Sequence, residues 1–274
     1  MTATLDQPVA VATGVVVRPW RAVLLRVEGQ WTWYRRHWTA SLLSSGLQPV
    51  LFLAAMGIGF GSQVRPGPLT GGMPYLAYVA PTILVSGLIT IAVAEAGLPV
   101  LSGFKWKQDY WAVASSPVTP GQLFTAELVW ITLRLVLGAV LYLVVTAVVG
   151  GWTSAGALLV APIAILTGAA CATPVMAFAA TTKGDGHAFA AVNRFVVMPM
   201  TLFAGTFFPI DRLPVAVRPL AWISPLWHGN ELARGVALGG LRLWPAVGHL
   251  AVLVGLLVFG LVLGRRCFRR RLVV

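Results

Sequence analysis

The chain has 274 residues, of which 58% are hydrophobic and 10% are charged, and its formal net charge at pH 7 is +12. Soluble globular domains carry about 25% charged residues, so this composition argues against a soluble protein of any class. A basic surplus indicates nucleic acid or an anionic membrane surface as the partner, and in a chain this apolar we expect the membrane. The expected partners therefore include membrane lipid and no nucleic acid.

An amphipathic stretch precedes the first long apolar run. Apolar and aromatic side chains recur there at alternating steps of four and three residues, which places on one helical stripe Trp20, Leu24, Val27, Trp31, Tyr34 and Trp38. Arginines occupy the other faces, so residues 20–38 are predicted to form an interfacial helix on the cytoplasmic side. The alternative is a stripe facing the core of a soluble domain, but these residues have no second element to pack on. We expect residues 1–19 to be a flexible tail.

Six apolar stretches are long enough to cross a bilayer as helices. A hydrocarbon core about 30 Å thick requires about 20 apolar residues of helix. The predicted spans are residues 42–61, 75–101, 122–149, 155–181, 190–208 and 243–263. A seventh stretch, residues 213–226, is shorter and contains three prolines, so we predict a re-entrant or interfacial hairpin there. The first long apolar run begins only near Leu42, so no cleavable signal peptide is expected.

The distribution of lysine and arginine predicts which ends of the spans face the cytoplasm. With six spans and the N-terminus inside, 13 basic residues lie on the cytoplasmic side and five on the opposite side. Cytoplasmic segments of membrane proteins carry the excess of these residues. We therefore predict a multi-pass protein of the cytoplasmic (inner) membrane with both termini in the cytoplasm.

The longest cytoplasmic loop, residues 102–119, reads SGFKWKQDYWAVASSPVT. Its polar and aromatic residues predict a short amphipathic helix that ends at a Ser-Pro pair. Thr119, Pro120 and Gln122 then provide an N-cap, a proline at the first helical position and the glutamine of a capping box, so the third span should begin there. A loop with such flanks can hold a fixed shape, and the alternative is a solvated connector.

The sequence contains no motif for catalysis or for metal binding. The four histidines and two cysteines are scattered, and neither a Gly-x-Ser-x-Gly turn nor a phosphate-binding Gly-Lys pair occurs. The eight acidic residues include no Asp-rich motif of the kind that binds a metal diphosphate. We therefore expect no catalytic residue, no metal and no cofactor in this chain.

Three charged residues lie inside the predicted spans, namely Glu95, Glu127 and Arg134. A charge near the middle of a span costs about 3 kcal/mol and normally faces protein or a wet cavity. Glu127 shares a helix face with Arg134, but seven residues separate them, which is too far for a direct pair. Glu95 is the other candidate partner. We favour structural pairing of Arg134 over contact with a substrate.

The most specific spacing lies between residues 207 and 234. A Leu-Pro pair is followed after ten residues by Pro-Leu-x-His and, five residues later, by an arginine. This pattern resembles the signature region of ABC-2 type exporter permeases, and the sequence departs from it at Thr206, where a smaller residue is expected. The signature residues are Pro209, Leu213, Pro214, Pro225, Leu226, His228 and Arg234.

Residues upstream extend the resemblance over most of the chain after residue 42. The run Tyr75–Pro81, Glu95, residues 105–120 and Glu127 are similar to the lipo-oligosaccharide (NodJ type) and daunorubicin-type branch of that family. Nothing can be carried over to residues 1–19.

The resemblance implies one transmembrane domain over residues 20–274, which works with a cytoplasmic ATP-binding subunit that holds ATP and Mg²⁺. It also implies a second permease protomer, as a homodimer or a heterodimer. Residues 20–38 would be the connecting helix, and residues 209–238 a re-entrant hairpin on the outer side, held in place by His228 and Arg234. The loop 102–119 would be a coupling loop, with a coupling helix over residues 104–115. Its ATPase-facing residues would be Phe104, Lys105, Trp106, Lys107, Gln108, Asp109, Tyr110 and Trp111.

The expected fold is an all-α integral membrane protein with six transmembrane helices, an interfacial helix and a re-entrant hairpin before the last span. The expected function is that of the permease subunit of an ATP-driven exporter, which moves an amphiphilic or hydrophobic substrate such as a glycolipid, a lipo-oligosaccharide or a drug. The alternatives are an ion-coupled secondary transporter and a membrane-embedded lipid transferase. A secondary transporter should carry a carboxylate near the membrane midplane, whereas Glu95 and Glu127 lie toward one end of their spans.

Overall fold

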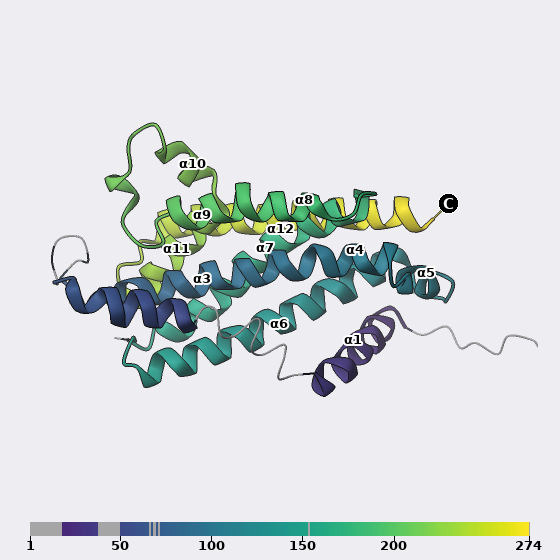
Figure 1. Ribbon diagram of the computed structural model, residues 1–274, viewed down its shortest axis with the longest axis horizontal. Coiled ribbons are helices and arrows are strands. Elements are labelled where there is room, and N and C mark those ends of the chain that lie inside the picture. The colour runs from purple at the N-terminus through teal and green to yellow at the C-terminus, as the bar shows by residue number, and fades with distance from the viewer. Residues whose placement is uncertain are drawn as a thin grey trace, which may run out of the picture.

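The fold is known from a computed structural model that describes residues 18–37, 50–65, 67, 70, 72–152 and 154–273. All regular structure in this part of the chain is helical, as the predicted all-α class requires. Figure 1 shows an elongated bundle whose longer helices run along its long axis. The α5 helix and the C-terminus lie at one end, and α10 and α11 lie toward the other.

The helices follow one another with short connections. In chain order they are α1 (Pro19–Arg36), η1 (Ala54–Phe60), η2 (Gly61–Gln63), α3 (Tyr75–Ala96), α4 (Leu98–Lys105), α5 (Asp109–Ala114), α6 (Pro120–Val148), α7 (Ala157–Thr181), α8 (His187–Val192), η3 (Asn193–Val197), α9 (Met198–Phe203), η4 (Ile210–Arg212), α10 (Arg218–Ile223), α11 (Pro225–Leu238) and α12 (Leu243–Leu272).

Four helical segments of the described chain are long and apolar enough to cross a membrane, and each matches a predicted span. They are Tyr75–Lys105 (α3 with α4), Pro120–Val148 (α6), Ala157–Thr181 (α7) and Leu243–Leu272 (α12). The predicted spans 42–61 and 190–208 match the shorter apolar helices Val50–Gln63 and His187–Phe203. Residues 42–49 lie outside the described part of the chain, so the count of six spans stays a prediction.

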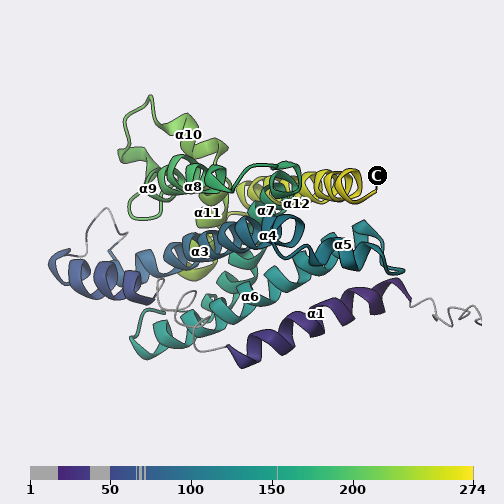
Figure 2. The same cartoon turned by 45° about the vertical axis from the view of Figure 1, so that its right-hand side comes forward.

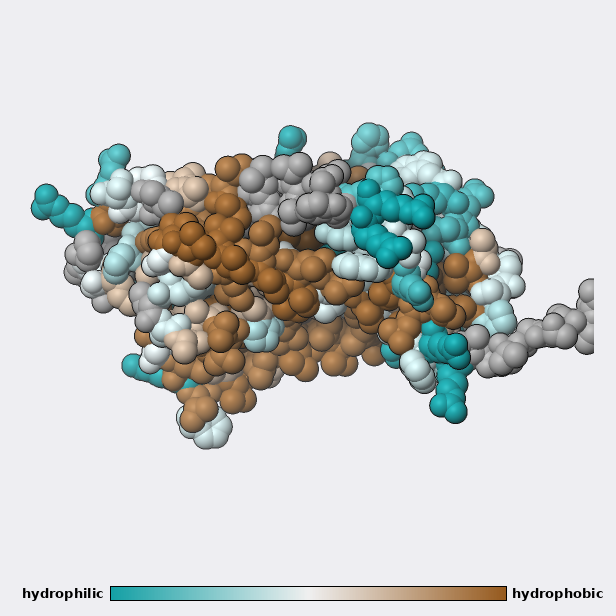
Figure 3. All heavy atoms as spheres, turned by 90° about the horizontal axis from the view of Figure 1, so that it is seen from below, coloured by the Kyte–Doolittle hydropathy of each residue, from teal (hydrophilic) through white to brown (hydrophobic). Residues whose placement is uncertain are grey.

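The centre of the bundle is formed by α3, most of whose side chains are buried. The α7 helix packs along both α3 and α12, while α6 and α11 complete the core. By contrast, α12 exposes large apolar side chains along much of its length. Figure 3 shows an apolar band across the middle of the molecule and polar residues gathered toward the ends. This arrangement suits a body surrounded by hydrocarbon.

The start of α6 confirms the predicted capping box. The Thr119 hydroxyl accepts a hydrogen bond from the Gln122 backbone N–H at 3.3 Å, and the Gln122 side chain accepts one from the Thr119 N–H at 2.8 Å. The helix ends at Gly150, whose φ of 74° is in the left-handed region, and Gly151 N–H bonds back to the Thr146 carbonyl at 2.8 Å. This Schellman ending satisfies carbonyls that the last turn leaves unpaired.

Two predicted boundaries differ from the structure. The second span does not end at residue 101, because a break at Gly97 is followed by α4, which reaches Lys105. Phe104 and Lys105 therefore belong to the end of the span, and the coupling helix predicted over residues 104–115 is instead a corner between α4 and α5. The last span is also longer than predicted, since residues 264–272 continue α12 as a helix.

The predicted interfacial helix is present as α1, but its packed face is not the predicted stripe. Among the stripe residues, Trp20 and Leu24 are exposed and Tyr34 is buried, while Trp38 lies outside the described residues. The helix packs against α6 through a neighbouring face that includes Ala22 and Arg26. Most of the apolar stripe is thus exposed, and its contact with a membrane surface stays a prediction.

Candidate functional site

Segments from five parts of the chain meet at the α5 end of the bundle. The start of α6 contacts α1, α5 and α12 there, and α5 also contacts α4 and α12. Figures 1 and 2 show these helices at the same end. The connection between α7 and α8 joins this end through Lys105, which pairs with Asp185. The hydrogen bond from Lys105 holds the pKa of the Asp185 carboxyl below its usual range. We call this group of segments the corner site.

The corner between α4 and α5 is built tightly. Gln108 has a φ of 53°, which turns the chain sharply between the two helices. The Tyr110 ring packs against Gly103, where a Cβ atom would lie 2.5 Å from the ring. The Trp111 indole N–H donates to the Phe104 carbonyl at 3.0 Å. These contacts are those of a loop with a defined shape, which is one of the two alternatives that its sequence left open.

An aromatic cluster fastens the corner to α6 and α12. Phe104 lies with its ring centroid 4.8 Å from that of Tyr110 and 5.0 Å from that of Phe268, and Phe124 lies 5.2 Å from Phe268. Phe268 is fully buried, although it lies beyond residue 263, where the last span was predicted to end. Edge-to-face pairs of this kind contribute about 1 kcal/mol each beyond the area they bury.

Arg271 also fixes the end of α12. Its Nη1 atom donates to the carbonyls of Ala179, Ala180 and Thr182 at 2.9 to 3.0 Å. These are among the last carbonyls of α7, which have no partner within their own helix. The guanidinium also lies 4.3 Å from the centre of the Phe104 ring. The basic end of α12 therefore caps another helix and supports the corner.

Glu127, one of the predicted intramembrane charges, pairs with α1. Arg26 lies 3.1 Å from Glu127 and 2.7 Å from Asp109, and the Gln30 amide donates to the second Glu127 oxygen at 2.7 Å. Burial opposes the charge of Arg26, but attraction to the two carboxylates outweighs it and raises the pKa of the guanidinium. Arg26 thus joins α1, α5 and α6 through one charged group.

Arg134 pairs with Glu95, which the sequence analysis named as a candidate partner beside Glu127. The two side chains meet at 2.9 Å between α6 and α3. The guanidinium also lies 4.8 Å from the centre of the Tyr34 ring, and Tyr34 makes an edge contact with Trp130 at 5.6 Å. Both carboxylates of the predicted spans therefore have an arginine partner, and the structural role of Arg134 stays a prediction.

A cavity of about 470 Å³ lies within the corner site. Side chains from α1, α5 and α6 line it, together with residues of α3 and α4. Trp106, Lys107 and Trp111 are exposed, with 52% of Trp106 accessible, and Lys107 also lines this cavity. The eight predicted coupling residues therefore divide into an outer group and a group that faces the bundle, which includes Phe104, Asp109 and Tyr110.

The signature residues gather at the opposite end, around α10 and α11. Leu213 and Leu226 are buried, and His228 is nearly so. Pro225 is at the first position of α11, where proline is favoured. Pro209 and Pro214 lie on either side of η4. A helical pair is thus present over residues 218–238, and its re-entrant insertion stays a prediction.

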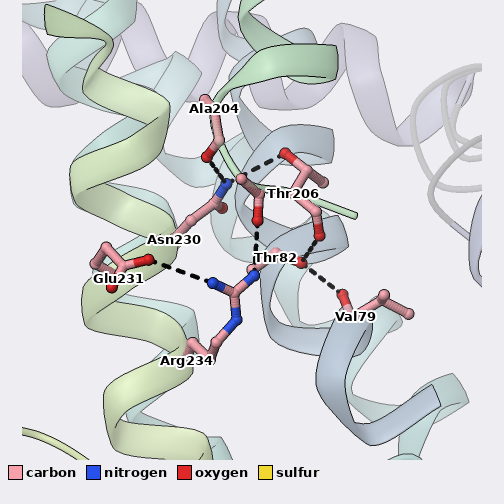
Figure 4. A network of polar contacts seen from close by, with 8 residues as sticks. Val79, Thr82, Ala204, Thr206, Asn230, Glu231 and Arg234 are labelled. Carbon is pink, nitrogen blue, oxygen red and sulfur yellow. Dashed lines mark hydrogen bonds and ion pairs between the residues drawn. The ribbon is translucent and has the colours of Figure 1, made fainter. Parts of the chain in front are cut away.

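Figure 4 shows the network that holds α11 to α3 through the turn at residues 204–206. Arg234 donates to the Gly205 carbonyl at 2.7 Å and pairs with Glu231 at 3.3 Å. The Asn230 amide donates to the Ala204 carbonyl at 3.0 Å and to the Thr206 hydroxyl at 3.2 Å.

From α3, Thr82 donates to the Thr206 carbonyl at 2.7 Å. Thr206, the departure from the family pattern, is fully buried, and its hydroxyl accepts the bond from Asn230. The residue is thus accommodated by a partner in this chain. Arg234 holds α11 in place, as we expected.

His228 does not join this network. Its Nδ1 atom instead lies 2.8 Å from Nδ1 of His249 on α12, a pair that appeared scattered in the sequence. Within the described residues no group of three or more histidine, cysteine or acidic side chains could hold a metal ion.

Sequence reasoning missed several residues of both sites. It assigned Arg26 and Gln30 to the polar side of α1 without a partner, and it left Asn230 and Arg271 without a role. Periodicity could identify the faces of α1, but the partners of Arg26 lie 83 and 101 residues away in the chain. The buried polar residues of α11 could have been found from the sequence. A polar side chain on an apolar helix face requires a hydrogen-bond partner, so its position indicates a contact with another segment.

Comparison with known proteins identifies the family of the chain. Curated relatives named Nodulation protein J are 28% identical over 254 residues in Rhizobium leguminosarum bv. viciae and 29% identical over 257 residues in Bradyrhizobium diazoefficiens. These alignments cover 92% of this chain in both cases, and 95% and 94% of the respective relatives. The family model described as ABC-2 type transporter matches residues 22–238. The chain therefore belongs to the ABC-2 type transporter family, as a membrane-embedded transport subunit.

Proposed function

We propose that this chain is the permease subunit of an ATP-driven exporter that moves an amphiphilic or hydrophobic substrate out across the cytoplasmic membrane. The ATP-binding partner that the family implies would bind and hydrolyse Mg²⁺-ATP, and this chain would convert that partner's motion into a change of access. A second permease protomer would complete the path along which the substrate crosses the membrane. The corner site is the observation that carries this proposal.

The proposed orientation places the corner site in the cytoplasm. The segments at the α5 end include α1 with the preceding Arg18, the α4–α5 corner, the α7–α8 connection and the end of α12, which together carry the 13 basic residues counted above. Such an excess marks the cytoplasmic side. Maleimide labelling of Lys183→Cys and Val215→Cys in intact cells tests this orientation, because the two thiols should react from opposite sides.

The corner has the features that a docking element requires. Its outer surface presents Trp106, Lys107 and Trp111, while its inner side is fixed to the bundle by the aromatic cluster and by Arg26. A push on the corner would therefore reach α3, α6 and α12 together, since packed helices transmit displacement rather than absorb it.

The proposed substrate class is supported by the surface and by the relatives. The middle of the molecule presents apolar side chains, which a lipid-like cargo could follow. The two carboxylates of the predicted spans, Glu95 and Glu127, are each paired with an arginine. A proton-coupled transporter needs a carboxylate that is free to titrate. The similarity to Nodulation protein J favours the lipo-oligosaccharide and drug exporter branch.

Charge reversal at the corner tests the docking role. Lys107→Glu combined with Trp106→Ala should abolish co-purification with the ATP-binding subunit and stop transport, while the amount of protein in the membrane stays unchanged. Lys183→Glu is the matched control, because it makes the same charge change at an exposed position of the same end. Normal association and transport by the Lys107 and Trp106 variant would contradict the docking role.

A further inference from the structure

We propose that the arginine-rich end of α12 binds the phosphate headgroup of an anionic phospholipid. Four exposed side chains form this site, which we call the arginine face: Arg265, Arg266, Arg269 and Arg270. Together with Gly121 at the start of α6, they line a hollow of about 410 Å³ at the α5 end of the bundle (Figure 1). The inference goes beyond the transport function, because it concerns a lipid that stays bound rather than a substrate that crosses the membrane.

The arginine face lies on the side of α12 that is turned away from the bundle. Its members occupy positions i, i+1, i+4 and i+5, which share one side of a helix. The opposite side is packed, since Phe268 and Leu272 are buried and Arg271 donates to three carbonyls at the end of α7. The end of α12 therefore uses one arginine to hold the bundle together and exposes the other four.

The described part of the chain does not compensate the positive charge of the arginine face. Arg265 donates to the Thr125 hydroxyl at 3.3 Å, but none of the four arginines forms an ion pair with a described carboxylate. The described residues that line the hollow include no acidic side chain. Like charges four residues apart destabilise a helix, and the arginine face contains two such pairs. An anion in the hollow would offset this repulsion.

The helix dipole and the topology of the chain account for only part of this cluster. Basic residues stabilise the last turn of a helix, where Arg269 and Arg270 lie, but Arg265 and Arg266 precede that turn. Topology requires basic residues on the cytoplasmic side of the membrane, and it does not require them to share one face of a helix. The common face therefore indicates a ligand.

The arginine face continues the exposed apolar surface of α12. Two series of exposed residues run along the helix with steps of four, three and four: Val258, Val262, Arg265 and Arg269, and beside them Phe259, Leu263, Arg266 and Arg270. A helix rises 1.5 Å per residue, so the first arginine of each series lies only about 4.5 Å beyond its last apolar residue. A phospholipid has the same order of parts, with acyl chains next to a phosphate. A soluble anion would use the arginines alone.

The chemistry of arginine selects a phosphate without a neighbouring cation. A guanidinium group presents its donors in a planar fork that can bond two phosphate oxygens at once. A phosphocholine headgroup would bring its own ammonium group among four guanidinium groups, so the arginine face favours a headgroup with net negative charge. Gly121 leaves space for it, because a Cβ atom there would meet nothing within 4 Å.

The test measures lipid binding by native mass spectrometry. Full-length protein in detergent micelles, freed of co-purified lipid, is titrated with phosphatidylglycerol, and the fraction that carries a lipid gives the Kd. Arg266→Gln combined with Arg270→Gln should raise this Kd about tenfold or more. The matched control is Arg35→Gln combined with Arg36→Gln, which removes two exposed charges at the end of α1 and should change the Kd less than about twofold.

An unchanged Kd in the Arg266 and Arg270 variant, or an equal rise in the control, would overturn the proposal. Lysine at both positions should restore binding to within about threefold of the original Kd, because it returns the charge but not the planar fork. A lysine variant that binds as weakly as the glutamine variant would overturn the assignment to a headgroup selected by charge.

Two further comparisons identify the ligand. Phosphatidylcholine should bind about tenfold more weakly than phosphatidylglycerol, and equal affinity for the two lipids would overturn the selection of an anionic headgroup. Glycerol 3-phosphate, which lacks acyl chains, should not displace phosphatidylglycerol even in about hundredfold excess. Displacement by this soluble phosphate would overturn the assignment to a membrane lipid.

An acidic surface of the ATP-binding subunit is the other partner that such a face could meet. Loss of co-purification with that subunit in the Arg266 and Arg270 variant, together with unchanged lipid binding, would assign the arginine face to the subunit and overturn the proposal. The lipid titrations use neither ATP nor a partner subunit. Their failure therefore removes only the lipid site, whereas failure of the Lys107 and Trp106 experiment removes the docking role.

Discussion

At the α5 end of the bundle, helices meet through ion pairs between side chains as well as through the bonds of Arg271 to backbone carbonyls. At the α11 end they meet mainly through side chains that hydrogen-bond to backbone carbonyls (Figure 4). The corner site also leaves two acceptors unpaired beside a cavity. The α11 network instead surrounds a single turn of chain, residues 204–206. Two side chains that form an ion pair can change partners during a transport cycle. A side chain bound to a backbone carbonyl stays in place unless the chain segment that carries this carbonyl moves.

This difference suggests separate roles for the two ends. The corner site would carry the motion that the ATP-binding partner drives, and the α11 network would hold the outer end as a fixed reference. Stability measurements can test the contrast, because removing an anchor should destabilise the whole bundle more than removing one member of an ion-pair network.

The largest expected effect is at the anchor. Arg234→Met keeps the length of the side chain but removes its bonds to Gly205 and Glu231 and its contact with the Tyr78 ring. We expect a loss of about 3 kcal/mol of stability, since each hydrogen bond to a charged group contributes about 1.5 to 3 kcal/mol. Thermal unfolding in detergent micelles measures the change. Arg242→Met, at an exposed arginine of the same end, is the control and should leave the midpoint unchanged.

A smaller effect is expected at the corner site. Glu127→Gln removes the charge that Arg26 and Gln30 share, but Arg26 keeps its pair with Asp109. We expect a loss of about 2 kcal/mol, because the remaining carboxylate partly compensates the buried guanidinium. The same unfolding experiment applies, with Glu28→Gln on the exposed side of α1 as the control. A loss larger than that of Arg234→Met would contradict the contrast between the two ends.

The sequence could predict those features that depend on neighbours along the chain. The start of α6 follows from Thr119, Pro120 and Gln122, which are local signals, and the four long apolar helices follow from composition alone. The pairing of Arg134 with Glu95 was within reach because only a few charges were available inside the spans. Each of these inferences needed no knowledge of how distant segments pack.

The remaining features depend on distant segments. Arg26 and Glu127 are 101 residues apart, and His228 and His249 lie on different helices, so neither pair has a signature in the sequence. Residues 264–272 appeared to be a polar tail because of their arginines, yet Phe268 and Arg271 are fixed by contacts with α4 and α7. Charge composition describes the average environment of a segment, whereas the burial of one residue depends on its partners.

Two glycines within helices, one at each end of the bundle, allow the packing of the two ends to be compared. The expected effect on stability is the smallest of those predicted here. A Cβ atom at Gly229 on α11 would lie 2.6 Å from the Thr167 hydroxyl and 2.9 Å from Val85, whereas a Cβ atom at Gly29 on α1 would meet nothing. Alanine is a better helix former than glycine by about 1 kcal/mol, so Gly29→Ala should raise the unfolding midpoint. Gly229→Ala should lower it, because the clash with α7 and α3 exceeds that gain by about 1 kcal/mol. Opposite shifts would show that α11 is closely packed where α1 is open, while a rise in both variants would mean that the α11 contact can relax and is no fixed anchor.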